Sequence, residues 1–518
     1  MAYKFFALGR KVLCLLLAAT FLLSACRSAP QARPMPASPA ASGKIRSYYL
    51  SLALRAADRV PDAVRRLSLY DRVLQLAIDA GLTDDAAVIL AYVAEALEFS
   101  SSEDWYEEYS TALSRRYLNL GKTKEAVDII NQKIQRVPQL TNDMRKRLLF
   151  EEIIDICFTG GDSFLVPMRQ TINAVLVLED PGMKTEILVK AAARFLRQGL
   201  VKDSQDLLQL TLSQIGSLEN PWDQAELFSR IALVYSSLRN ERRTREYAQR
   251  AAAEIDAIQV IVRSQEDAAK VGLVAENLQR LGSPEAALHV VSTIEYPWIA
   301  AETLCRMGIL SKNGALIDKA YETASSIPND ARRVSTLLQL DFLMAEAKKT
   351  KDVANNLVLR EAELSVIPAL AVDSFTSRLA RLYIAVGNQE AAVKTAGRIR
   401  DAYSRSGILL SAARAYLDAG KPKAAAPLLE ESRILAAGAG QSQGRILLDV
   451  SGVYLEAADI HGAIASAADI IDPYSFAVAA ADLTRYFIEK KTDPAPEDLR
   501  ALEDVLKSAA PSNTLKKN

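Results

Sequence analysis

Residues 383–392, YIAVGNQEAA, contain a spacing that recurs along the chain. Tyr383 is followed by glycine four positions later, at Gly387, and by alanine nine positions later, at Ala392. This spacing is typical of a helical hairpin. The ring fills the groove between two helices, glycine ends the first helix in a left-handed conformation, and the small alanine lets the second helix approach closely. Further copies are Tyr117 with Gly121 and Ala126, Tyr416 with Gly420 and Ala425, and looser ones at Phe195, Tyr235, Leu278 and Tyr454.

A second recurring feature marks where the first helix of several units begins. Asp or Asn stands directly before proline in Asp180-Pro181, Asn220-Pro221 and Asp472-Pro473. The polar side chain can cap a helix, and proline is tolerated at the first helical position because the N–H that it lacks would have no partner there. A ring near the helix start precedes the groove aromatic by 13 residues in three units, Trp222 to Tyr235, Tyr403 to Tyr416 and Tyr474 to Phe487.

Helical periodicity continues over about residues 44–507. Apolar residues recur three and four positions apart, and no sustained alternation predicts a strand. We therefore expect an all-α fold, a right-handed α-solenoid. A period near 38 residues gives about 12 hairpins over this length, each in contact mainly with its neighbours.

The aromatic-x3-Gly-x4-Ala spacing resembles the middle of the tetratricopeptide repeat, loosely and over most of the chain. Ala380 and Ala413 stand where that family often has glycine, and the unit from Pro181 to Pro221 is longer than the family's repeat. Another class of α-solenoid remains an alternative.

The N-terminus has the parts of a secretory signal. Lys4, Arg10 and Lys11 precede an apolar run at residues 12–23, which is too short to span a membrane comfortably. The run ends in Leu23-Ser24-Ala25-Cys26, which resembles the lipobox of bacterial lipoproteins. The resemblance implies cleavage before Cys26 and acylation of that residue, and two or three acyl chains make a stable anchor. The alternative is an ordinary leader that is cut after Ala25 and leaves Cys26 free.

These features divide the chain into five segments. They are a lipoprotein signal peptide at 1–25, a lipidated cysteine and Pro/Ala-rich tether at 26–44, N-terminal hairpins at 45–158, tetratricopeptide-like repeats at 159–508, and a disordered tail at 509–518. We place the internal break at residues 158–162, where Gly160 and Gly161 are adjacent, and expect a capping helix at 498–507.

The composition gives little indication of a cofactor. Lys+Arg and Asp+Glu both number 63, so bulk charge favours neither nucleic acid nor direct binding to an anionic bilayer. His289 and His461 are the only histidines, too few for a histidine-dependent zinc site. We expect Cys157 and Cys305 to be buried thiols, with a disulfide between them as the alternative. We predict no cofactor, no metal and no small-molecule substrate.

Two short motifs have a catalytic alternative. Residues 440–444, GQSQG, match the G-x-S-x-G string around Ser442, but that motif requires a strand-to-helix turn, and residues 428–437 have a helical pattern. Gly121-Lys122-Thr123 is similar to the end of a phosphate loop, yet Arg116 occupies the place of the upstream glycine. We interpret both as connections between helices and predict a protein that is not an enzyme.

Arginine recurs two residues before the groove aromatic. At 100° per residue this offset turns the side chain about 160° away from the packed ring, toward solvent. In the tetratricopeptide family that side of the first helix lines a peptide-binding groove. The resemblance implies that Arg381 and Arg414, with Asp418, take part in a groove for an acidic peptide or chain terminus. The alternative is a solvated helix face. The four arginines are Arg115, Arg381, Arg414 and Arg485.

The leading prediction is a lipid-anchored scaffold of the cell envelope that binds other proteins or peptides and contacts the membrane only through its lipid. By the sorting rule known for bacterial lipoproteins, Arg27 after the cysteine favours the outer membrane. The alternatives are a surface-exposed adhesin that contacts a host and an envelope hydrolase that uses Ser442.

Overall fold

The computed structural model describes residues 38–40, 43–98, 103–257, 264–367 and 371–508. These residues form 25 α-helices and four short 3-10 helices, with no strand among them. The expected all-α class and α-solenoid are confirmed. The proposed leader, the lipid site Cys26 and the tail at 509–518 lie outside the described residues. None of the described helices is long and apolar enough to cross a membrane.

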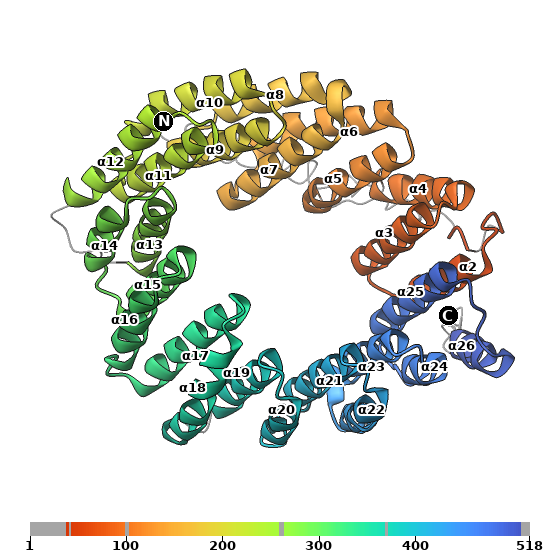
Figure 1. Ribbon diagram of the computed structural model, residues 1–518. Helices are drawn as coiled ribbons and strands as arrows, with labels where there is room; N and C mark the ends of the chain where they lie inside the picture. The colour runs from red at the N-terminus through yellow and green to blue at the C-terminus, as the bar shows by residue number, and fades with distance from the viewer. Residues whose placement is uncertain (1–37, 41–42, 99–102, 258–263, 368–370, 509–518) are drawn as a thin grey trace, which may run out of the picture.

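The helices form a closed ring with an inner and an outer row (Figure 1). The inner helices are α3 (Ala63–Asp79), α5 (Glu103–Asn119), α7 (Asp143–Thr159), α9 (Pro181–Arg197), α11 (Pro221–Ser237), α13 (Gln265–Arg280), α15 (Pro297–Ser311), α17 (Asp330–Glu346), α19 (Val372–Ala385), α21 (Ala402–Asp418), α23 (Gln443–Glu456) and α25 (Pro473–Lys490). The outer helices are α4 (Thr83–Glu98), α6 (Thr123–Arg136), α8 (Leu165–Leu176), α10 (Val201–Ile215), α12 (Glu241–Ala257), α14 (Pro284–Ser292), α16 (Gly314–Ser325), α18 (Thr350–Glu363), α20 (Gln389–Ala396), α22 (Pro422–Ala437) and α24 (Ile460–Ala468). Two further helices, α2 (Tyr48–Asp58) and α26 (Pro496–Ser508), lie where the ends meet, and the 3-10 helices are η1 (Val137–Gln139), η2 (Gly161–Phe164), η3 (Leu364–Val366) and η4 (Gly440–Ser442).

Every inner helix is followed by a residue in the left-handed conformation, which confirms the repeat. The predicted turn residues Gly121, Gly387 and Gly420 have φ of 72°, 82° and 68°. Equivalent positions recur about 37 residues apart on average, which gives twelve units and agrees with the expected number. The twelve residues are Gly81, Gly121, Gly161, Gly199, Arg239, Gly282, Lys312, Lys348, Gly387, Gly420, Ala458 and Lys491.

The adjacent glycines at 160 and 161 belong to this repeat. Gly161 is the left-handed residue of the third unit, with φ of 64°, and it is the first residue of η2. Gly160 is needed for packing, because a Cβ there would lie 2.1 Å from the ring of Phe164. The boundary that we placed at 158/159 therefore falls inside one hairpin, and the apolar core around α7 continues from Ala126 to Ala392.

The predicted helix starts also occur. The side chains of Asp180, Asn220 and Asp472 each accept a hydrogen bond from a backbone N–H in the first turn of α9, α11 and α25. Proline occupies the first position of all three helices. The caps satisfy N–H groups that have no partner within the helix, which fixes where each inner helix begins.

The sequence pattern gives no sign that the two ends of the array meet. In the structure α2 packs on α25, and a second apolar core joins residues 50–113 to residues 380–502. Because α25 has no outer helix following it directly in the chain, α2 takes that position. The twelfth unit is therefore composite, with an inner helix from the C-terminal part of the chain and an outer helix from the N-terminal part (Figure 1).

A repeated hydrogen bond identifies α2 as the outer helix of that unit. Ser114 Oγ donates to the carbonyl of Ala126, and Ser451 Oγ to that of Ala463, each over 2.9 Å and each from an inner helix to its own outer helix. Both serines stand three residues before the groove aromatic. At the same place in α25, Thr484 Oγ1 donates over 3.0 Å to the carbonyl of Tyr49 in α2.

Contacts between adjacent units recur in the same way across the closure. The guanidinium of Arg332 lies 4.6 Å from the ring centroid of Trp298, and that of Arg445 lies 4.7 Å from the ring of Tyr403. Each arginine is in the first turn of an inner helix, and each ring is in the first turn of the preceding one. Arg65 on α3 lies 5.5 Å from Tyr474 on α25, so α3 follows α25 as any inner helix follows another.

The predicted terminal helix is present as α26, but it packs where the ends meet. It contacts α24, and its backbone carbonyl at Val505 accepts a hydrogen bond from Arg59 Nη1 over 3.0 Å. Glu503 on α26 accepts a hydrogen bond from the Tyr48 hydroxyl over 2.6 Å. The helix therefore contacts α2 as well as the last hairpin.

The end of the expected tether is attached to the ring. Ser38 Oγ donates to Asp58 Oδ2 over 2.5 Å and accepts a hydrogen bond from the Tyr70 hydroxyl over 3.1 Å. The chain thus contacts the folded body six residues before the boundary predicted at residue 44.

Candidate binding surface on the inner helices

Ion pairs connect the exposed sides of the inner helices from α7 to α11. Arg147 on α7 binds Glu186 on α9 over 2.6 Å, and Arg230 on α11 lies 3.6 Å from the same carboxylate. Lys190 on α9 binds Glu151 on α7 over 2.6 Å. Each pair joins two consecutive units, so cations and carboxylates on this part of the inner face neutralise one another.

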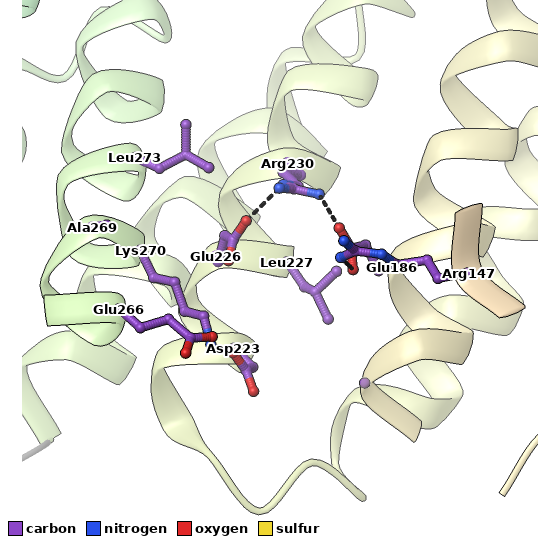
Figure 2. Close-up of a pocket in the computed structure, with 11 residues that line it drawn as sticks. Arg147, Glu186, Asp223, Glu226, Leu227, Arg230, Glu266, Ala269, Lys270 and Leu273 are labelled. Carbon is purple, nitrogen blue, oxygen red and sulfur yellow. Dashed lines mark hydrogen bonds and ion pairs between the residues drawn. The ribbon is translucent and has the colours of Figure 1, made fainter. Parts of the chain in front are cut away.

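A cavity of about 440 Å³ opens among these side chains (Figure 2). Lys270 Nζ on α13 lies 2.7 Å from Asp223 on α11, and Arg230 lies between Glu226 and Glu186. The lining residues are Arg147, Gly182, Glu186, Asp223, Glu226, Leu227, Arg230, Glu266, Ala269, Lys270 and Leu273.

The pKa values of two carboxyls in this cavity shift in opposite directions. Burial acts to raise the pKa of Glu186, but the hydrogen bond and charge of Arg147 and the charge of Lys190 outweigh it and hold this pKa below its usual value. Burial raises the pKa of Glu226, because Arg230 compensates only in part. Since each positive side chain here already has an acidic partner, the cavity has little charge left for a ligand.

At α17 and α19 an arginine of the inner face is bound by uncharged side chains instead of carboxylates. Arg378 on α19 donates to Ser335 Oγ over 2.9 Å and to Gln339 Oε1 over 3.2 Å, and both acceptors are uncharged side chains of α17. Burial lowers the pKa of Arg378 below its usual value, with Glu302 giving a smaller opposing effect. Glu302 itself lies 3.6 Å from Arg306.

Two more arginines flank Arg378 without a carboxylate partner. Arg381, one turn further along α19, is exposed and makes no hydrogen bond or ion pair within the described part of the chain. Arg332 on α17 is exposed and stacks on Trp298. Arg332, Arg378 and Arg381 are called the arginine arc below.

The structure places all five predicted side chains at the surface, as expected from their position relative to the groove aromatic. They are distributed around the ring and form no single cluster. Arg115 is on α5, Arg381 on α19, Arg414 and Asp418 on α21, and Arg485 on α25, and each of the five is exposed.

Two of these predicted arginines have acidic partners that the spacing did not indicate. Arg414 Nε lies 2.9 Å from Glu456 on α23, and the described ion pairs include none between Arg414 and Asp418. Arg485 lies 4.0 Å from Asp482, which also binds Arg72 of α3 across the closure. Arg381 is therefore the predicted arginine that belongs to the arginine arc.

Sequence reasoning missed Arg378 and Arg332. A usable signal for Arg378 was its place one turn before Arg381, on the same exposed stripe of α19. The usable signal for Arg332 was its place in the first turn of α17. Trp298 stands in the first turn of the preceding inner helix, α15. What the sequence could not supply is that the hydrogen-bond acceptors of Arg378 are Ser335 and Gln339, and that Glu302 contributes only a charge interaction that burial outweighs.

The elements of the catalytic alternative lie apart. Ser442 precedes α23 in a 3-10 turn rather than at the end of a strand. His461 follows the far end of that helix, about 20 Å away at 1.5 Å per residue. Its Nδ1 lies 2.8 Å from Asp498 of α26, which raises the pKa of the imidazole. Within the described ranges no group of three His, Cys, Asp or Glu side chains could hold a metal ion.

The two cysteines of the ring are free and buried. Cys157 lies in α7 and Cys305 in α15, and no disulfide joins them. Burial raises the pKa of both thiols to about 12. They therefore belong to the core, as expected from their apolar neighbours.

No family model matches this chain, and no curated protein matches it either. Solved structures give distant likenesses. Ton1535 from Thermococcus onnurineus NA1 is 14% identical, with 66% of this chain and 98% of that chain covered and a TM-score of 0.29. A circular tandem repeat protein with novel repeat topology is 15% identical, with 86% and 96% covered and a TM-score of 0.18. A Rap protein complexed with competence and sporulation factor is 14% identical, with 86% and 99% covered and a TM-score of 0.22. At these TM-scores the helices are arranged differently overall, and the likenesses identify no ligand for this chain.

Proposed function

We propose that this protein is a non-enzymatic scaffold that binds acidic segments of other proteins or peptides on the inner face of the ring. The observation that carries the proposal is the arginine arc. Arg378 is half-buried, is held by the uncharged side chains of Ser335 and Gln339, and has exposed guanidinium groups on either side.

Electrostatics favour an acidic partner at this place. A guanidinium that has lost part of its hydration regains stability when a carboxylate pairs with it, and its planar fork donates hydrogen bonds to both carboxylate oxygens at once. Stacking on Trp298 holds Arg332 in one orientation. On α7 to α13 the charges of the inner face are already paired, as at Arg147 and Glu186. The arc therefore has positive charge left for a partner, which that stretch of the inner face lacks.

The location of the scaffold is part of the proposal. The lipobox-like ending at Cys26 supports a lipid anchor in the cell envelope, with the outer membrane favoured by Arg27. Twelve residues separate Cys26 from Ser38, which is attached to the ring. In an extended conformation they reach about 37 Å. The ring would then lie close to the membrane that holds the anchor, with its inner face available to envelope proteins.

The binding site is tested with the double substitution Arg378→Gln and Arg381→Glu in the full chain. We expect at least tenfold weaker binding of fluorescent poly-L-glutamate, measured by anisotropy at low salt. Arg115→Glu is the matched control, because Arg115 is equally exposed at the equivalent position of another unit but has no arc around it. Equal affinities of the double variant and the wild type would rule out the arc as the site. Crosslinking in intact cells, followed by capture, would then identify the natural partner.

A further inference from the structure

The composite twelfth unit is the place where the ring is closed without a covalent connection. In each of the other eleven units a short turn joins the inner helix to its outer helix, as at Gly420 between α21 and α22. In the twelfth, α2 reaches α25 from the other end of the chain, so contacts alone hold it in place. A repeat array opens most easily where the interface between neighbours has the least support.

The contacts of α2 combine apolar packing in the second core with polar groups near the surface. Leu50 and Leu54 are fully buried, and the ring of Tyr49 lies 5.1 Å from that of Phe487. The Tyr49 hydroxyl donates to Asp493, and the Tyr48 hydroxyl donates to Glu503 on α26. Both of these hydrogen bonds are exposed, so water can replace them when the helix leaves.

The position of Tyr49 differs from its counterparts in the covalent hairpins. The carbonyl that accepts the repeated hydrogen bond belongs to a fully buried alanine in two other units, Ala126 and Ala463. In α2 it belongs to the partly buried Tyr49. A large ring that packs on Phe487 and reaches the surface replaces the small side chain that lets helices approach closely.

The residue that follows α25 is not glycine. Lys491 has φ of 52°, a left-handed conformation that a residue with Cβ adopts at a cost, and four of the other units also have a non-glycine residue there. After Lys491 the chain runs on to α26, which covers α2 through Glu503 and the carbonyl of Val505. Two elements thus hold α2 from outside its own part of the chain.

We infer that α2 is a detachable latch: the ring opens where α25 meets α2 and α3, the junction that no chain connection spans, once α2 leaves and the α25–α3 contact separates, and the inner face admits a partner through this opening. The chain that leads into α2 is held by Ser38 at Asp58 and Tyr70, so a load on the N-terminal segment acts first on the latch. The part of the inference that concerns a partner rests on the proposed function above. It concerns an acidic polypeptide segment whose ends belong to folded domains and therefore cannot thread through a closed ring.

Native-state hydrogen exchange tests the latch without any partner. We expect amides of α2 to exchange faster than those of the outer helices α10 and α16 under conditions where the ring as a whole stays folded. Thr484→Val should raise the exchange rate of α2 about fivefold, the effect of one net hydrogen bond. Ser451→Ala is the matched control, since it removes the equivalent bond within a covalent hairpin and should leave α2 unchanged. Protection of α2 equal to that of α10 and α16, and unaffected by Thr484→Val, would overturn the latch.

Closing the latch chemically tests its role in binding. Tyr49→Cys and Asp493→Cys, in the full chain that also carries Cys14→Ser and Cys26→Ser, allow a short bismaleimide to link α2 to the segment that follows α25. The remaining cysteines, Cys157 and Cys305, are buried and unreactive. The probe is poly-L-glutamate in two forms, with free ends and with a folded domain fused to each end. We expect the crosslink to slow binding of the flanked form at least tenfold and to leave the free form unaffected.

The outcomes separate the two proposals. Equal binding rates of the flanked form before and after crosslinking would overturn entry through the latch. If neither form binds the wild-type ring, the proposed function fails, and hydrogen exchange alone still decides whether α2 is a latch. If the amides of α2 exchange fast in the unlinked double-cysteine variant and slowly after crosslinking, the crosslink acts at this contact.

Discussion

The Thr484 hydroxyl on α25 and the Tyr49 carbonyl on α2 form a 3.0 Å hydrogen bond, although 435 residues separate them in the chain. The same bond joins Ser114 to Ala126 and Ser451 to Ala463, which are only 12 positions apart in the chain. Closure therefore uses the geometry that the repeat already has, and requires no new kind of interface. An array with this curvature can bring its last inner helix beside its first, and α2 then fills a place that any unit would offer.

Closure also changes how the ends are protected. An open array of hairpins exposes an apolar surface at each end and needs polar capping helices. Here the core that contains Leu52 and Phe476 continues from the last unit into the first, so the apolar surfaces of both ends are buried against each other. The helix expected as a cap at 498–507 is present, but as α26 it covers the α2 contact.

Two glycine-to-alanine substitutions should test the packing between inner and outer helices. We expect one to lower the stability of the ring and the other to raise it. A Cβ at Gly308 on α15 would lie 2.7 Å from Ile317 Cγ1 and 3.0 Å from the carbonyl oxygen of Asn313, so Gly308→Ala should destabilise the ring by about 1 to 3 kcal/mol. Gly452 on α23 has open space around its Cβ direction, so Gly452→Ala should stabilise it by about 0.5 to 1 kcal/mol. Urea unfolding of the two variants measures both. A loss of stability in both would show that the α15–α16 approach is not the specific constraint.

The ion pairs of the inner face should make stability depend on pH through Glu186. Its pKa is lowered in the folded ring, so its contribution is present above the usual pKa of a glutamate and disappears as the pH falls through the lowered value. We expect Glu186→Gln to cost about 1.5 to 3 kcal/mol at pH 7, the value of hydrogen bonds to a charged group, and less at pH 3, which is below the usual pKa of a glutamate. Urea unfolding of wild type and variant at the two pH values measures the difference. An equal cost at both would assign the effect to packing rather than charge.

The sequence predicted the repeat well because its signals are local. A left-handed turn, a helix cap and a groove aromatic each depend on a few adjacent residues, and Gly121, Gly387, Asn220 and Asp472 all act as expected. The pattern predicts a break at the adjacent glycines 160 and 161, because neighbouring residues alone do not indicate that Phe164 packs on Gly160.

Closure and the arginine arc lie beyond a local reading for a different reason. Whether an array closes depends on the sum of small rotations between units, and no single residue determines that sum. Similarly, Arg381 could be placed at the surface from its offset to Tyr383, but its isolation from carboxylates depends on side chains of other helices. Arg414 has the same offset in its own unit, yet Glu456 on α23 neutralises it.

The two thiols of the ring should report on global unfolding. Cys157 and Cys305 are buried, and the pKa of each is raised to about 12, so little reactive thiolate exists at neutral pH. In the Cys14→Ser, Cys26→Ser chain we expect no labelling by a thiol reagent over hours at pH 7.5 and labelling of both residues in 6 M guanidinium chloride. Labelling of one cysteine in native buffer would reveal local opening at α7 or α15, and would contradict an opening confined to α2.

Membrane attachment should depend on Cys26 and not on the ring. None of the described helices can cross a bilayer, and bulk charge is balanced, so a lipid on Cys26 is the attachment that we propose. In cells, Cys26→Ser should move the protein from the membrane fraction to the soluble fraction, while its circular dichroism and urea midpoint stay those of the wild type. Arg27→Lys is the matched control, because it changes the next residue and leaves the cysteine. Membrane attachment of Cys26→Ser would contradict the anchor, and loss of its helical signal would show instead that the N-terminal segment contributes to the fold, through the contact of Ser38 with Asp58.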